Sequence, residues 1–148
     1  MNTRVEETIK RHDKGYNCAQ AVACTYADLV GLDEETLFKL TEALGAGMGG
    51  MEGTCGAVSG ACVLAGLVNT QTGAIDFVVC STGNLETPNS KGKTYKLSRE
   101  IVNEFLDKNS SVVCKELKGV TTGKVLRPCA DCIKDAAKIA EEVLFSDK

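Results

Sequence analysis

Eight cysteines are the residues with the most chemistry to offer in this chain of 148 residues. A chain of that length folds around a hydrophobic core without covalent cross-links. Eight thiols in 148 residues also lie below the density of disulfide-built mini-proteins, which is about 8–10%. The first residues carry no export signal, so we expect a cytoplasmic protein with reduced thiols. Spaced cysteines in that compartment indicate redox catalysis or metal binding rather than structural disulfides.

Three of the cysteines directly follow a residue that favours the start of a helix. They are Cys18 after Asn17, Cys55 after Thr54 and Cys129 after Pro128. The helix dipole and the free backbone N–H groups at such an end stabilise a thiolate and lower its pKa from about 8.5 toward roughly 3.5–7.5. A thiolate is both the nucleophile of disulfide exchange and a metal ligand.

The third of these helix starts carries a Cys-x-x-Cys motif, Cys129-Ala130-Asp131-Cys132. Such a pair closes an intramolecular disulfide or chelates a metal. A zinc ribbon needs a second pair or two histidines at fixed spacing, but His12 is the only histidine and lies in a charged segment, where we expect it to be solvated. Cys24, Cys62 and Cys80 follow no capping residue, and we expect them to fill gaps in the core.

Apolar residues recur at three- and four-residue steps along most of the chain, which is the spacing of helices. We predict an all-α fold: a single compact multi-helix domain over residues 1–148 with about five principal helices. The expected helices cover about 16–30, 33–44, 54–68, 97–105 and 129–145, with a short one at 112–118. Residues 69–92 are polar and rich in glycine, and we expect an internal loop region there.

Residues 45–53 form a glycine-rich segment before Cys55. A glycine-rich loop at a helix start can bind phosphate, but this one follows a helix and lacks the Gly-Lys-Ser/Thr ending of a P-loop. We therefore favour backbone freedom that presents Cys55. Gly53, Gly56 and Gly60 are the positions where a cofactor could come close to the backbone. The four-residue spacing of Gly56 and Gly60 is also typical of close helix packing.

Charge and hydropathy exclude several classes of protein. The formal net charge is −3 and the pI is about 5.2, and no basic run is present, so we expect neither nucleic-acid binding nor an electrostatic membrane anchor. The longest apolar-rich stretch, residues 55–68, is shorter than the roughly 20 residues of a membrane-spanning helix. We therefore expect no membrane insertion.

Four segments spread over nearly the whole chain resemble a known family. They read Gly15-Tyr16-Asn17-Cys18-Ala19-Gln20-Ala21-Val22, Thr54-Cys55-Gly56-Ala57-Val58-Ser59-Gly60, Cys114-Lys115-Glu116-Leu117, and Cys129 ahead of Ile133-Lys134-Asp135-Ala136-Ala137. In this order they resemble the C-GCAxxG-C-C family, small prokaryotic proteins described as redox-active. The resemblance implies four family cysteines, Cys18, Cys55, Cys114 and Cys129. It also implies an association with oxidoreductase and transporter genes, and prosthetic groups such as iron–sulfur clusters.

The chain departs from the family pattern at Cys132, where an apolar residue is expected. Either Cys132 or Cys114 could therefore partner Cys129. The central motif also reads Cys-Gly-Ala-Val-Ser-Gly, which differs from the letters of the family label.

Two functions follow from these observations. In the first, the chain is a thiol-dependent oxidoreductase: Cys55 attacks, a second cysteine among Cys18, Cys114, Cys129 and Cys132 resolves the disulfide, and the partner is a redox protein or a small thiol. In the second, Cys18, Cys55, Cys114 and Cys129 converge on zinc or an iron–sulfur cluster, whose usual ligand set is four thiolates. A helical interaction module whose thiols only pack is a third hypothesis.

Overall fold

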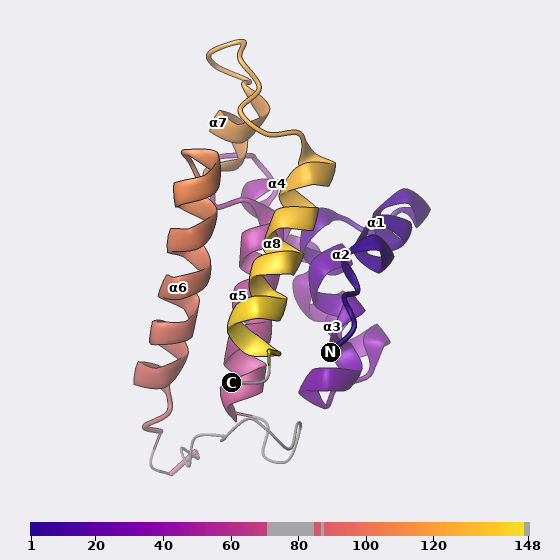
Figure 1. Cartoon of the computed structure of the whole chain (residues 1–148), viewed down its shortest axis with the longest axis vertical. Helices are drawn as coiled ribbons and strands as arrows, with labels where there is room; N and C mark the ends of the chain where they lie inside the picture. Colours follow the sequence, from indigo (N-terminus) through magenta and orange to yellow (C-terminus); the bar gives the residue numbers. More distant parts are fainter. Residues whose placement is uncertain (71–84, 87, 147–148) are drawn as a thin grey trace.

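Helix α5 (Gly56–Thr70) lies at the centre of the molecule, where it packs against α2 (Cys18–Thr25), α6 (Lys91–Asn109) and α8 (Cys129–Leu144) (Figure 1). This computed structural model describes residues 1–70, 85–86 and 88–146. Within these ranges no strand forms, and one isolated antiparallel bridge joins Thr54 and Val113. The predicted all-α fold with about five principal helices is confirmed.

Shorter elements surround these four helices. They are α1 (Val5–Lys14), α3 (Glu34–Thr41), α4 (Gly45–Met48), α7 (Cys114–Lys118) and two 3₁₀ turns at Ala27–Val30 and Glu42–Leu44. The helices expected over 16–30 and 33–44 are thus each an α-helix that continues as a 3₁₀ turn. Helix α1 was not predicted, because six of its ten residues are charged and its apolar face is narrow.

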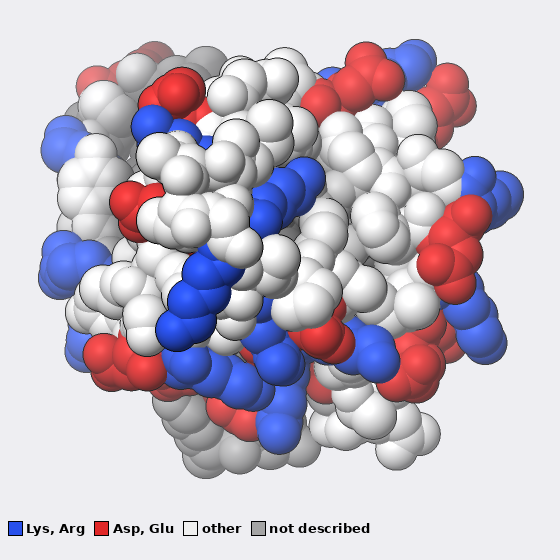
Figure 2. Space-filling model, turned by 90° about the horizontal axis from the view of Figure 1, so that it is seen from above, with Lys and Arg blue, Asp and Glu red and all other residues white. Residues whose placement is uncertain are grey.

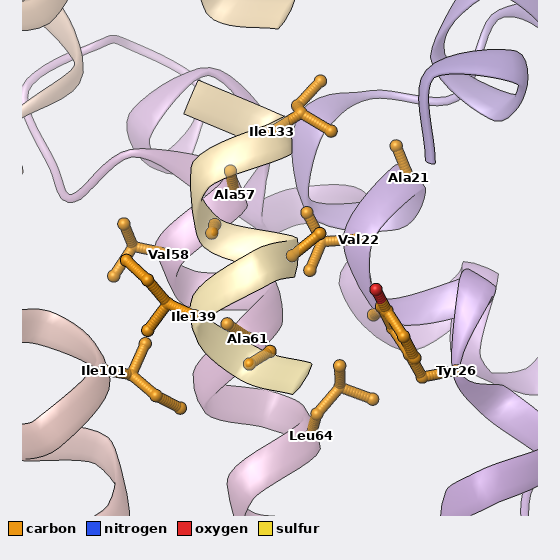
Figure 3. Packing of buried hydrophobic residues seen from close by; sticks show 14 of the residues in the cluster. Ala21, Val22, Tyr26, Ala57, Val58, Ala61, Leu64, Ile101, Ile133 and Ile139 are labelled. Atoms are coloured by element: carbon orange, nitrogen blue, oxygen red, sulfur yellow. The ribbon is translucent and has the colours of Figure 1, made fainter. Parts of the chain in front are cut away.

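Small residues let the central helices approach closely. A Cβ atom at Gly60 of α5 would lie 2.6 Å from the backbone oxygen of Ala19 in α2, so only glycine permits this spacing. Around that contact, side chains of α2, α5, α6 and α8 fill the core (Figure 3). The Gly56–Gly60 spacing predicted close helix packing, and the structure confirms it at Gly60.

The tight packing brings several helix starts to one end of the molecule, the upper end in Figure 1, where α7 and the first turn of α8 lie. The first residues of α2, α5, α7 and α8 meet there and line one cavity: Cys18, Gly56, Cys114 and Cys129. No helix in the described part of the chain is long and apolar enough to cross a membrane.

The predicted loop region 69–92 is described only at its edges. Asn69 and Thr70 complete α5, and Lys91 and Gly92 begin α6. The residues between 71 and 84, which include Cys80, lie outside the described residues.

Candidate functional site

Five of the eight cysteines line a single cavity at the upper end of the molecule. They are Cys18 at the start of α2, Cys55 just before α5, Cys114 at the start of α7, and Cys129 and Cys132 in the first turn of α8. These are the five cysteines that the sequence indicated as functional. The cavity has a volume of about 20 Å³, which is enough for about one water molecule.

Cys18 and Cys129 form a hydrogen-bonded pair, which we call the outer pair. The Cys129 thiol donates to Cys18, and this bond lowers the pKa of Cys18 to about 6 in spite of burial. The backbone N–H groups of Ala46 and Ala19 and the charge of Lys118 also favour the Cys18 thiolate. Donation to Cys18 and burial raise the pKa of Cys129. The outer pair is therefore a thiolate beside a thiol.

Local sequence explains how Cys18 is presented. Asn17 caps α2 as predicted: its side chain accepts from the Gln20 N–H at 2.9 Å, and the Gln20 side chain accepts from the Asn17 N–H at 3.0 Å. On the facing loop, Ala46 has a left-handed backbone, with φ 51° and ψ 44°. Such a conformation costs an alanine on the order of 1 kcal/mol. It directs the Ala46 N–H toward the Cys18 sulfur.

Cys55 and Cys132 form a second hydrogen-bonded pair, the inner pair. The Cys132 thiol donates to Cys55 and lowers its pKa, and burial opposes the shift. The N–H groups of Ala57 and Val58 also donate to Cys55, whereas the nearby charge of Cys18 acts in the opposite direction. Donation to Cys55 and burial raise the pKa of Cys132.

Cys55 itself is the residue directly before α5, the N-cap position that Thr54 was expected to occupy. The helix begins at Gly56, and Thr54 lies instead in the bridge to Val113. The sulfur of Cys55 therefore takes the place of a capping oxygen, since it accepts from the second and third N–H groups of the helix. A capping position stabilises an anion.

Cys114 lines the same cavity but differs from the other four. Burial raises the pKa of its thiol, and the charges of Cys55 and Cys18 add to this, against the charge of Lys118. Among the described residues no second thiol hydrogen-bonds to Cys114. Cys114 therefore lies beside the two pairs without belonging to either, and the thiol that hydrogen-bonds to Cys129 is that of Cys18.

The cysteines expected to fill the core lie outside this cavity. Cys24 is buried in the core and its thiol contacts the Glu34 oxygen at 3.7 Å; burial raises its pKa to about 11. Cys62 is half-buried against the core, and burial raises its pKa as well. Their expected packing role is confirmed. Cys80 lies outside the described residues.

The three glycines named as cofactor-contact positions have different surroundings. A Cβ at Gly56 would lie 2.3 Å from the Cys18 sulfur, so the missing side chain leaves room for that sulfur over the start of α5. Gly60 contacts the backbone of α2, and Gly53 faces Gly47. Gly56 alone of the three lines the cavity. His12 is half-buried, with Nδ1 3.1 Å from the Tyr16 oxygen, and does not line the cavity.

Two cations complete the cavity wall, and sequence reasoning missed both. Lys118 stands at the end of α7, and Arg127 lies in the loop before α8. Arg127 pairs with the buried carboxylate of Asp135, and its backbone oxygen lies 3.7 Å from the Cys132 sulfur as an alternative acceptor for the thiol proton. Burial opposes the charge of Asp135, but hydrogen bonds from Arg127 and Lys108 hold its pKa below the ordinary value. No local pattern links these residues, because they come from separate elements.

The expected metal ligands share this cavity but do not form a metal site as they stand. Within residues 1–70, 85–86 and 88–146, no group of three or more Cys, His, Asp or Glu side chains is arranged to hold a metal ion. The sulfurs hydrogen-bond in two pairs instead. A cavity of about 20 Å³ is also comparable with one water molecule rather than with a multi-atom cluster.

A family model matches residues 16–143 of the chain. Its description is "Putative redox-active protein (C_GCAxxG_C_C)". The match spans all five cysteines of the cavity. No curated protein and no solved structure matches the chain.

Proposed function

Because this chain belongs to the C-GCAxxG-C-C family, we propose that it is a thiol–disulfide redox protein whose outer and inner pairs cycle between dithiol and disulfide. One observation carries the proposal: five cysteines line one cavity, where a neighbouring thiol lowers the pKa of Cys18 and of Cys55. Disulfide exchange needs a stabilised thiolate and a second thiol close enough to resolve the mixed disulfide. The lowered pKa of Cys18 and of Cys55 and the thiol beside each of them support this chemistry.

The outer pair meets the partner, because Cys129 is half-buried whereas Cys18 and Cys55 are only 7% and 5% exposed. A partner thiolate attacks the Cys129 sulfur of an oxidised outer pair. The bond to Cys18 breaks, and its electrons leave on Cys18, whose low pKa makes it a good leaving group. A second partner thiolate then attacks the partner sulfur and releases Cys129, which takes up one proton. The partner has lost two electrons as a disulfide, and the outer pair has gained them.

The inner pair exchanges with the outer pair inside the protein. Its two residues, Cys55 and Cys132, are 5% and 2% exposed, and Cys132 lies one helical turn from Cys129. The Cys55 thiolate attacks the oxidised outer pair, and Cys132, after losing its proton, attacks Cys55. The inner pair becomes the disulfide, and the proton passes to the outer pair, which returns to thiolate and thiol. This order assigns the first contact with a partner to Cys129 rather than to Cys55.

Mild oxidation followed by alkylation and peptide mapping tests the proposal. We expect bridges between Cys18 and Cys129 and between Cys55 and Cys132. Cys129→Ser should abolish the first bridge and should also stop a protein disulfide from oxidising the inner pair. Cys62→Ser, outside the cavity, serves as the control and should change neither. If no bridge joins any two of the five cavity cysteines, the proposal is wrong.

Metal binding by the same cysteines is the alternative, and it has one observation in its favour, namely that four family cysteines share a cavity. It requires both hydrogen-bonded pairs to separate and the sulfurs to regroup around one ion. Protein purified without oxygen would then contain zinc or iron in stoichiometric amounts. Metal-free protein that forms the two bridges would exclude it.

A further inference from the structure

Lys118 places a positive charge at the edge of the thiol cavity. The residue is exposed at the end of α7 and lines the cavity. Its charge acts on three of the sulfurs, those of Cys18, Cys114 and Cys129. Within the described part of the chain, Lys118 has no salt bridge.

Two neighbouring cations, Lys115 and Arg127, each form a salt bridge with a carboxylate. Lys115, one turn earlier on α7, lies 2.8 Å from Glu52. Arg127, on the other side of the cavity, lies 2.9 Å from Asp135. Carboxylates compensate the charges of Lys115 and Arg127, whereas the charge of Lys118 acts on the cavity thiols.

The loop after α7 adds a second cation. A Cβ at Gly119 would lie 2.4 Å from the backbone carbonyl of Lys124, so the loop folds back against the end of α7 and brings Lys124 beside it. Figure 2 shows Lys and Arg side chains crossing the middle of this end of the molecule. The acidic residue nearest in sequence to the cavity thiols is Asp131, whose charge acts on Arg127. The chain as a whole is acidic, with net charge −3, so attraction of an anion to the cavity depends on these local cations.

The size of the cavity limits what enters it. A volume of about 20 Å³ has room for little more than one heavy atom with its hydrogens. The reacting sulfur of a substrate therefore enters the cavity, and the rest of the substrate lies outside. The group bonded next to that sulfur then lies over the cavity edge, where Lys118 stands.

We propose that Lys118 selects disulfides and thiols that carry a carboxylate close to the reacting sulfur, with Lys124 as a second, weaker contact. This inference rests on the proposed function and names its substrate class. A carboxylate over the cavity edge would face the Lys118 ammonium group, whereas a cationic substrate would be repelled. An exposed pair of this kind contributes up to about 1 kcal/mol, which corresponds to about fivefold in rate.

Reaction rates with disulfide reagents of different charge test this inference. The reduced protein is mixed with anionic 5,5′-dithiobis(2-nitrobenzoic acid), neutral 4,4′-dithiodipyridine and cationic cystamine. The ratio of anionic to neutral rates cancels any change in the nucleophile, because the same thiolate attacks both reagents. Lys118→Gln should lower this ratio about fivefold, Lys118→Glu should lower it further, and Lys118→Arg should preserve it. Lys91→Gln, at the start of α6, is the matched control and should leave the ratio unchanged.

Ionic strength and substrate size give independent readouts. Salt at about 0.5 M should lower the ratio for the unmodified protein and have little effect on Lys118→Gln, because the Debye length falls to a few ångströms. Oxidised glutathione and a peptide disulfide with acidic residues beside its cysteines distinguish a small substrate from a protein segment. An unchanged ratio in Lys118→Gln and Lys118→Glu would overturn the inference and leave the proposed function standing. If no reagent modifies the five cavity cysteines, both are wrong.

Discussion

Arg127 binds Asp135 at two points: its Nε donates to Oδ2 at 2.9 Å, and its Nη2 donates to Oδ1 at 3.2 Å. Asp135 is only 4% exposed and also pairs with Lys108 of α6 at 2.9 Å. Through these ion pairs, the Asp135 carboxylate links α8 both to α6 and to the loop before α8. The same loop places the Arg127 backbone oxygen 3.7 Å from the Cys132 sulfur, so this ion pair positions the inner pair.

Asp135→Asn should destabilise the protein, because two cations lose their common partner. Removing one member of a buried pair costs about 3–5 kcal/mol, and since both cations are partly exposed we expect about 2 kcal/mol. Urea unfolding measures this loss. Glu35→Gln, which removes the exposed pair with Lys39, is the control and should cost less than about 0.5 kcal/mol. Equal losses in the two variants would contradict the role of Asp135.

The thiolate of Cys18 should give its reactivity a characteristic pH dependence. With a pKa of about 6, alkylation of Cys18 by iodoacetamide should rise with a midpoint near pH 6 and level off above pH 7. Cys24, whose pKa is raised to about 11, should stay unmodified below pH 9. Peptide mapping after short labelling pulses measures both. A midpoint above pH 8 for Cys18 would show that its thiolate is not stabilised.

The same pKa implies a pH dependence of stability. Cys18 titrates lower in the folded chain than in the unfolded chain, where its pKa is about 8.5. The unfolded state therefore binds more protons, so the stabilisation grows as the pH rises from about 6 to 8.5 and is lost as the pH falls through 6. Urea midpoints of the unmodified protein and of Cys18→Ser should diverge over this interval. Parallel midpoints would contradict the shift.

Three glycines of α5 offer a matched series of alanine substitutions. Gly56→Ala should push the Cys18 sulfur away from its place and raise the midpoint of its alkylation. Gly60→Ala should clash with α2 and cost about 1–3 kcal/mol without changing that midpoint. A Cβ at Gly66 would have its nearest neighbour at 3.9 Å, so Gly66→Ala should be neutral or stabilise by up to about 1 kcal/mol. Unfolding and labelling experiments together distinguish the three.

The Cys114→Ser variant distinguishes disulfide exchange from metal binding. Disulfide exchange through the outer and inner pairs does not use its thiol, so Cys114→Ser should retain both bridges after oxidation. A four-cysteine metal site would lose a ligand and most of its affinity. Bridge mapping and metal analysis on this variant give opposite results under the two functions.

Local sequence signals and the family resemblance together indicated the five cysteines that line the cavity, but not how they pair. Asn17 and Pro128 mark helix starts by their own chemistry, and Cys18 and Cys129 follow from them. The pairing of Cys55 with Cys132 depends on how α5 packs against α8, and residues so far apart in sequence show no periodic signal. The left-handed Ala46 escapes prediction for another reason: alanine rarely adopts that conformation, and only the surrounding fold imposes it.

Cys129 and Cys132 stand on the first turn of α8, whereas their partners Cys18 and Cys55 lie at the starts of α2 and α5. Oxidation of the outer and inner pairs would therefore tie α2 and α5 to α8 and close chain loops of about 110 and about 80 residues. One loop of that length restricts the unfolded ensemble by about 4.5–5 kcal/mol in the chain-entropy model, and the second adds less because the two loops share most of their residues. The fully oxidised protein should thus melt at a distinctly higher temperature than the reduced one, so that a thermal scan reports its redox state without any partner.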